Sequence, residues 1–178
     1  MTQNQKGPRL ENPDFDHLAY FKRLESLIYI MLIIPLVFFG WAFLEREKTG
    51  DLRAVFFEEP DMMFHGVMAI GVAYVLMRTV MTWKRDMRKA LEDVPYLDVK
   101  LQMLRKPILF RNIMWVLGCG IGAYGIYDKG DMLYAMVFML FMILITANRP
   151  SATYFIKLLR LKEEEKKWIQ RQKNTPAE

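Results

Sequence analysis

The sequence predicts an all-α membrane protein with four transmembrane helices, arranged as two hairpins with amphipathic helices along the cytoplasmic surface. Four stretches contain no Asp, Glu, Lys or Arg, and they cover residues 26–44, 62–77, 112–127 and 132–148. Of the 25 Lys and Arg residues, 21 fall in the N-terminal segment, the middle connection and the C-terminal tail, and 4 fall in the other two connections. Because loops rich in Lys and Arg remain in the cytoplasm, we expect a multi-pass protein of the inner (plasma) membrane with its N-terminus and C-terminus in the cytoplasm.

The composition favours membrane spans over a soluble helical bundle. Of the 178 residues, 53% are hydrophobic and 25% are charged, a mixture that is expected when apolar spans alternate with charged connections. A span needs about 20 mainly apolar residues, so the four spans with their flanks are expected at about 26–44, 60–83, 110–127 and 131–148. They form a single domain, 12–171, between ends at 1–11 and 172–178 that are expected to be disordered.

Three interfacial amphipathic helices are expected, at about 13–25, 95–106 and 152–171. The first begins at Asn12-Pro13-Asp14, where Asn caps the helix and Pro takes the first helical position. The third sets apolar side chains against a run of charges. The second carries an apolar stripe with helical spacing, formed by Leu97, Leu101, Leu104 and Ile108.

Within the spans, Pro35 removes one backbone hydrogen bond, and a kink is expected there. Asp128-Lys129-Gly130-Asp131 reads as a tight outer turn, so the third and fourth spans are expected to form a close antiparallel hairpin. Val94-Pro95 is expected to end the helix that continues from the second span.

The two halves of the chain resemble each other. Gly50-Asp51 aligns with Gly130-Asp131, and Ile30-Met31 aligns with Ile113-Met114, at offsets of 80 and 83 residues. Both halves would start from the cytoplasm, so a duplication would be a parallel tandem repeat. The identities are few, and the similarity of any two membrane hairpins is the alternative explanation that the sequence favours.

Small residues recur with helical spacing in two spans. They are Gly66, Ala69 and Ala73 in the second span and Gly118, Gly122 and Gly125 in the third. Small faces let helix backbones approach closely in lipid. Such a face contacts either a partner subunit or a neighbouring helix of the same bundle, and packing within the bundle is the favoured interpretation.

Three polar residues near the span ends are candidate functional positions. Arg78 lies near the inner interface and is expected to extend to the head groups, with a buried ion pair as the alternative. His65 follows Asp61 by one turn near the outer interface, where the two side chains are close enough to pair. A partly hydrated interfacial histidine is favoured there over proton or quinone chemistry. His17 falls on the opposite side, so a bis-histidine haem held by this chain is not expected.

No catalytic, cofactor-binding or metal-binding residues are expected. The spans contain no Asp or Glu, whereas coupled secondary transporters place carboxylates there. The chain has no Cys/His cluster, no phosphate-binding glycine loop and no nucleophile–base pair. Met132, Met136, Met139 and Met142 form a stripe. Thioethers suit monovalent copper, but packing is the favoured role because methionine fills irregular gaps.

We therefore expect a non-catalytic integral membrane subunit that packs within a larger bacterial inner-membrane complex and stabilises or scaffolds it. The expected partners are other integral membrane subunits and anionic lipid head groups, and nucleic acid is not expected. The first alternative is a homo-oligomeric channel or small transport protein. The second is a membrane-embedded enzyme or a copper-handling protein.

Overall fold

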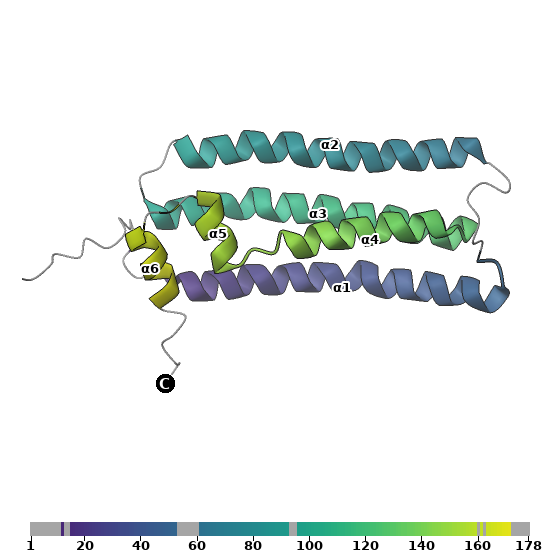
Figure 1. Ribbon diagram of the computed structural model, residues 1–178, viewed down its shortest axis with the longest axis horizontal. Helices are drawn as coiled ribbons and strands as arrows, with labels where there is room; N and C mark the ends of the chain where they lie inside the picture. The colour runs from purple at the N-terminus through teal and green to yellow at the C-terminus, as the bar shows by residue number, and fades with distance from the viewer. Residues whose placement is uncertain are drawn as a thin grey trace, which may run out of the picture.

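The computed structural model describes residues 12, 15–52, 61–92, 96–159, 161 and 163–171, and every regular element within them is an α-helix (Figure 1). The helices are α1 (His17–Thr49), α2 (Met62–Glu92), α3 (Leu97–Lys129), α4 (Met132–Ala147), α5 (Ala152–Leu159) and α6 (Glu163–Arg171). The expected disordered ends at 1–11 and 172–178 lie outside the described residues, as do Pro13 and the expected break at Val94-Pro95.

Three helices, α1, α2 and α3, are long and apolar enough to cross a membrane. The fourth expected span corresponds to α4, which has 16 residues and is about 24 Å long at 1.5 Å per residue. That length is below the bilayer core of about 30 Å. Helices α4 and α5 together are long and apolar enough to cross a membrane, but the helix axis bends by 80° between them. The described part of the chain thus has three helices that are compatible with a membrane location, or four if the bent pair counts as one span.

Helix α3 is the centre of the bundle. It packs against α1, α2 and α4, and 56% of its most apolar 18-residue window is buried, against 17% for α1 and 11% for α2. Helices α1 and α2 lie on opposite sides of α3 (Figure 1). The helices of the expected first hairpin are therefore separated by α3, whereas α3 and α4 form the expected close hairpin.

Helices α1 and α3 run parallel and in register. At one end, the Tyr20 hydroxyl donates a hydrogen bond of 2.6 Å to the Leu101 carbonyl. At the other end, Arg46 Nε donates one of 2.7 Å to the Tyr127 carbonyl. Both contacts join residues that are 81 positions apart. Equivalent depths along the two helices therefore differ by about 81 in residue number.

The expected interfacial segments at 13–25 and 95–106 continue into the spans without a break. Residues 17–25 and 97–106 form the first turns of α1 and α3. Helix α1 begins later than expected, because Asp16, and not Asn12, caps it by accepting a hydrogen bond from the Ala19 amide. The stripe of Leu97, Leu101, Leu104 and Ile108 is 0–3% exposed and lies in the main hydrophobic core. An apolar helical stripe indicates that one face of the helix is covered, but not whether lipid or protein covers it. Here the stripe packs against other helices of the protein. The third segment, 152–171, contains the two separate helices α5 and α6.

Helices α1 and α3 also match in length and in buried positions. Each has 33 residues and ends at a glycine with a left-handed backbone, Gly50 (φ 72°) and Gly130 (φ 66°). The two helices begin and end 80 residues apart. The buried positions of α1 are His17, Phe21, Leu24, Ile28, Pro35 and Ala42, and the residues 80 positions later are also buried. A parallel repeat would have this relation between its halves.

Candidate functional site

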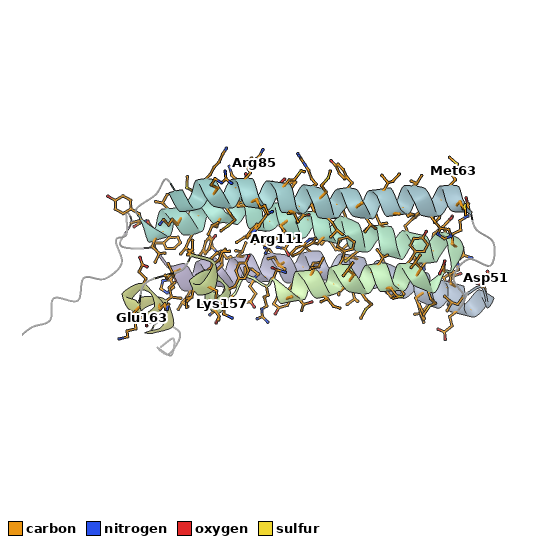
Figure 2. All side chains as sticks on the ribbon, turned by 45° about the horizontal axis from the view of Figure 1, so that its top comes forward. Asp51, Met63, Arg85, Arg111, Lys157 and Glu163 are labelled. Carbon is orange, nitrogen blue, oxygen red and sulfur yellow. The ribbon has the colours of Figure 1, made fainter. Side chains whose placement is uncertain are left out.

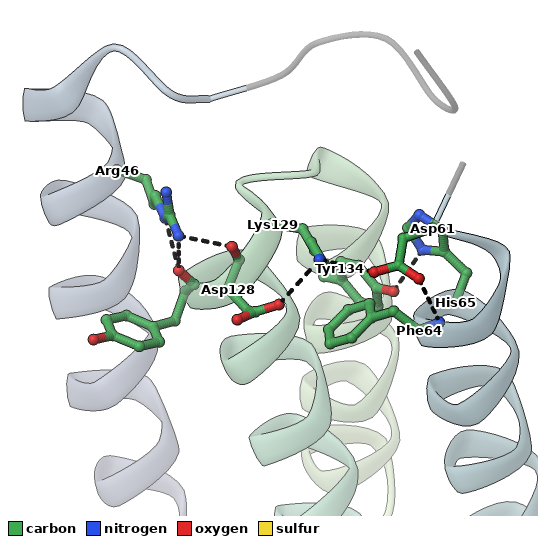
Figure 3. Close-up of polar contacts among 8 residues, drawn as sticks. Arg46, Asp61, Phe64, His65, Asp128, Lys129 and Tyr134 are labelled. Carbon is green, nitrogen blue, oxygen red and sulfur yellow. Dashed lines mark hydrogen bonds and ion pairs between the residues drawn. The ribbon is translucent and has the colours of Figure 1, made fainter. Parts of the chain in front are cut away.

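Polar side chains gather at the end of the bundle where α1 and α3 end and α2 and α4 begin (Figure 3), which we call the outer end after the topology that the sequence predicts. The residues labelled there form the outer polar cluster, which consists of Arg46, Asp61, Phe64, His65, Asp128, Lys129 and Tyr134. The local sequence fixes this end, because aspartates begin two of the helices. Asp61 Oδ1 accepts a hydrogen bond from the Phe64 amide at 3.2 Å, and Asp131 Oδ1 accepts one from the Leu133 amide at 2.8 Å. Such side-chain acceptors satisfy the free N–H groups of a first helical turn.

Lys129 joins the end of α3 to the start of α2. Its ammonium lies 3.0 Å from Asp61 Oδ2, 3.6 Å from Asp128 Oδ2 and 4.9 Å from the centre of the Phe64 ring. The hydrogen bond from Lys129, assisted by the Phe64 amide, lowers the pKa of the Asp61 carboxyl. The pair is exposed, so solvent screening keeps its contribution to stability small.

His65 joins α2 to α4. Its Nδ1 lies 2.7 Å from the Tyr134 hydroxyl, and the two rings stack with centroids 5.7 Å apart and an angle of 13° between their planes. The residues that the sequence placed close enough to pair thus have partners from distant parts of the chain. Asp61 contacts Lys129, and His65 contacts Tyr134. The other histidine, His17, begins α1 at the opposite end of the bundle.

Arg46 joins α1 to the last turn of α3. Its guanidinium donates to the Tyr127 carbonyl and, at 2.7 Å, to the Asp128 carbonyl, and it lies 3.4 Å from Asp51 Oδ2. A cation at the end of a helix stabilises the free carbonyls and the helix dipole there. Arg46, Lys129 and His65 together connect the outer ends of α1, α2, α3 and α4.

The contacts of the outer polar cluster hold the helix ends together. Among the described residues, no group of three or more His, Cys, Asp or Glu could hold a metal ion. The contacts of His65 and Lys129 are made to a phenol and to carboxylates, and neither pair contains an alcohol or thiol nucleophile. The geometry stabilises the helix ends.

A second polar site, which sequence reasoning missed, surrounds Arg111 inside the bundle (Figure 2). This side chain is 5% exposed. Its guanidinium carbon lies 4.1 Å from the centre of the Trp83 ring and 4.8 Å from that of Trp115. It donates to the Tyr154 hydroxyl at 2.9 Å and to the Asn148 carbonyl at 3.2 Å. One cation thus connects α2, α3, the end of α4 and α5.

The charge of Arg111 is compensated by aromatic faces and neutral oxygens. Among the described residues, no carboxylate forms an ion pair with it, and its Nε has no hydrogen-bond partner. Burying a cation without a carboxylate is costly, and the cost falls when ring faces and acceptors surround it. From the sequence, Arg111 counted only as one of the basic residues flanking the third span. The available signal was aromatic: Trp115 follows Arg111 by four positions, Trp83 ends the expected second span, and Tyr154 follows the expected fourth span.

The two small-residue faces have different surroundings. A Cβ atom built on Gly122 would lie 2.7 Å from the Phe138 amide nitrogen, and one on Gly118 would lie 2.5 Å from the Phe141 ring. Gly125 faces the Tyr134 ring in the same way. The glycines of α3 thus give α4 the space for its aromatic side chains.

In α2, by contrast, Gly66, Ala69 and Ala73 are exposed, and a Cβ atom on Gly66 would meet nothing within 4 Å. They lie opposite Val75 and Thr79, which are buried. Arg78 is also exposed on α2. In α4, Met136 and Met139 point away from the bundle and are more than half exposed.

Comparisons of the chain with protein-family models, with curated proteins and with solved structures find no match.

Proposed function

We propose that this chain is a non-catalytic integral membrane subunit that packs within a larger inner-membrane complex, with both termini in the cytoplasm. The observation that carries the proposal is the outward face of α2, which Gly66, Ala69 and Ala73 form. Facing outward, these residues are free to meet a helix of another chain.

The comparison with α3 supports a protein partner for this face. In α3 a similar row of small residues, at i, i+4 and i+7, is covered by Tyr134, Phe138 and Phe141 of α4. In α2 the row at i, i+3 and i+7 is exposed within the described residues. Flexible lipid chains gain little from such a face, whereas a second helix gains close dispersion contacts. We infer that a helix of a partner subunit lies along α2.

The contacts that join the helices at two levels fit this role. Arg46, Lys129 and His65 hold the outer helix ends together, and Arg111, near the middle of α3, joins α2, α3, the end of α4 and α5. A bundle joined at two levels presents α2 as a fixed surface, and a rigid surface loses little entropy when a partner binds.

The experiment is native purification in mild detergent of the wild type and of an Ala69→Leu/Ala73→Leu variant. The wild type should co-purify with unrelated membrane chains at fixed stoichiometry. Two leucines would push the partner helix away, and recovery of those chains should fall by roughly tenfold or more.

The matched control is Val67→Leu/Met81→Leu, which changes two exposed residues of α2 outside the small face and should keep the complex. Equal losses in both variants would contradict the docking face. A homo-oligomer of the purified chain that conducts ions in liposomes with a reproducible unitary conductance would favour the channel alternative instead.

A further inference from the structure

Six exposed basic side chains lie at one level of the bundle, two on each of three helices. We call them the basic collar, and they are Lys22 and Arg23 of α1, Arg88 and Lys89 of α2, and Arg105 and Lys106 of α3. From these residues we propose that the collar binds the head groups of anionic phospholipids around the α5 end of the protein. This inference is independent of the partner helix on α2.

The common level follows from two contacts with α3. The Tyr20 hydroxyl bonds to the Leu101 carbonyl, and because α1 and α3 run parallel, the basic pair of α1 lies within about one turn of the basic pair of α3. The Arg111 guanidinium lies over the Trp83 ring. Because α2 runs antiparallel to α3, moving five or six residues from this contact reaches Arg88 and Lys89 on one helix and Lys106 and Arg105 on the other.

The cations of the collar are not neutralised by the protein. Within the described residues, no ion pair involves any of the six. Three described carboxylates near the collar have other partners. Glu25 pairs with Arg149, Asp86 pairs with Arg85 at 3.0 Å, and Asp98 accepts the Asn12 amide at 2.9 Å. Six like charges at one level therefore present an uncompensated positive field.

The depth of the collar matches that of lipid phosphates. Trp83, Trp115 and Tyr154 surround Arg111, and tryptophan and tyrosine are typical of the membrane interface. Lys106 lies five residues from Arg111 along α3, about 7.5 Å further from the apolar spans. The collar is thus directly outside the aromatic level, where head groups lie.

The positions of the collar residues also favour a binding partner that surrounds the protein. Helices α1 and α2 lie on opposite sides of α3 (Figure 1), and the collar residues of all three helices are exposed, so the collar covers more than one side of the bundle. A nucleic acid or an acidic peptide would need its cations on one face. A ring of lipid head groups contacts all sides at one depth, and each cation near an anionic membrane surface adds to the attraction.

The test measures lipid binding to the purified full-length chain in neutral detergent by native mass spectrometry. Phosphatidylglycerol and phosphatidylcholine with identical acyl chains are the two probes. The wild type should prefer phosphatidylglycerol, and this preference should weaken at high salt. In the variant Arg23→Gln/Arg88→Gln/Arg105→Gln the preference should fall by roughly tenfold or more.

The matched control is Lys48→Gln/Lys157→Gln/Lys167→Gln, which removes three exposed cations outside the collar and should retain most of the preference. Equal losses in the two variants, or no preference in the wild type, would overturn the proposal. Competition by inorganic phosphate or glycerol phosphate as strong as that by the lipid would identify a soluble-anion site instead. Melting in phosphatidylcholine micelles checks folding, and if the triple variant is unfolded, the three single substitutions must show partial losses.

Discussion

At the scale of single residues, helix contacts in this bundle depend on the absence of a side chain at one position. Gly122 faces the backbone of α4, where a Cβ atom would lie 2.7 Å from the Phe138 nitrogen and 2.8 Å from the Tyr134 oxygen. Backbone atoms cannot rotate away as a flexible side chain can. Tolerance of a larger residue therefore differs sharply between glycines that are neighbours on the same helix.

We expect Gly122→Ala to destabilise the protein by about 1–3 kcal/mol, the usual range for overpacking. The matched control is Gly120→Ala, because a Cβ atom there meets nothing within 4 Å. Alanine is the better helix former by roughly 0.5–1 kcal/mol, so the control should be neutral or stabilising. Thermal melting of the purified variants in one detergent measures both, and equal effects at the two positions would contradict the α3–α4 contact.

The ion pair of Asp61 and Lys129 should make stability depend on pH in the acid range. The pair lowers the pKa of the Asp61 carboxyl below its usual value, which is about 4. The stabilisation is therefore fully present above the usual value and is lost as the pH falls through the lowered one. Melting temperatures between neutral and acid pH should show a smaller acid loss for Asp61→Asn than for the wild type.

The same substitution in a Lys129→Gln protein distinguishes the effect of this ion pair from that of other carboxylates. In a Lys129→Gln protein the hydrogen bond that contributes most to the lowered pKa is gone. Asp61→Asn should then change the pH dependence much less. If the substitution has the same effect in both backgrounds, Lys129 is not the cause.

At the scale of helices, the sequence predicted where the helices lie along the chain better than which helices pack against each other. The first three charge-free stretches fall within α1, α2 and α3, and the fourth matches α4 together with Asn148, the residue that caps its end. Helix α1 also includes Lys22 and Arg23, which precede the charge-free stretch. Charged residues are compatible with a helix outside the membrane, so the charge pattern alone does not locate the helix end. The central place of α3 was also hidden, because spans that are apolar on every side carry no stripe that distinguishes protein from lipid.

The sites were predicted only in part, because their contacts are distant in sequence. Asp61 and His65 were named as candidates, but their partners lie 68 and 69 residues away. Arg111 was missed for a different reason. A basic residue beside a span is normally a flanking charge, and only the fold shows that Trp83 and Tyr154 enclose it.

Arg111 should hold α5 against the bundle. The rings of Phe21 in α1 and Phe155 in α5 also pack together, with centroids 5.0 Å apart. Replacing Arg111 with Gln removes its cation–π contacts and the reach of its guanidinium to Tyr154 and Asn148. We expect the backbone amides of α5 to exchange faster with deuterium, and hydrogen-exchange mass spectrometry of the purified protein measures this rate.

The matched control for this experiment is Arg78→Gln, which removes an exposed cation from α2 and should leave the rate unchanged. Arg111→Lys keeps the charge but loses the planar fork that reaches two acceptors at once, so an intermediate rate is expected. A rate that is unaffected by Arg111→Gln would show that the apolar contacts of Phe155 position α5 alone.

At the scale of the whole molecule, the orientation in the membrane depends on whether α4 crosses it. The charge distribution predicts four crossings, because the 21 basic residues of the termini and the middle connection would then share one side. A short helix crosses if its ends lie at the head groups or if the bilayer thins around it. The turn of 80° after α4 would then place α5 along the cytoplasmic surface, where Lys157 reaches water.

Labelling of single cysteines in intact cells decides between four crossings and three. In a Cys119→Ala background, cysteines that replace Thr49 and Lys129 should react with an impermeant thiol reagent, because both lie at the outer ends of α1 and α3. Cysteines that replace Gln5 and Asn174 should react only after the membrane is opened. If position 174 reacts in intact cells while position 5 does not, α4 and α5 together fail to cross and the chain has three spans. If positions 5 and 174 react while 49 and 129 do not, the whole orientation is reversed.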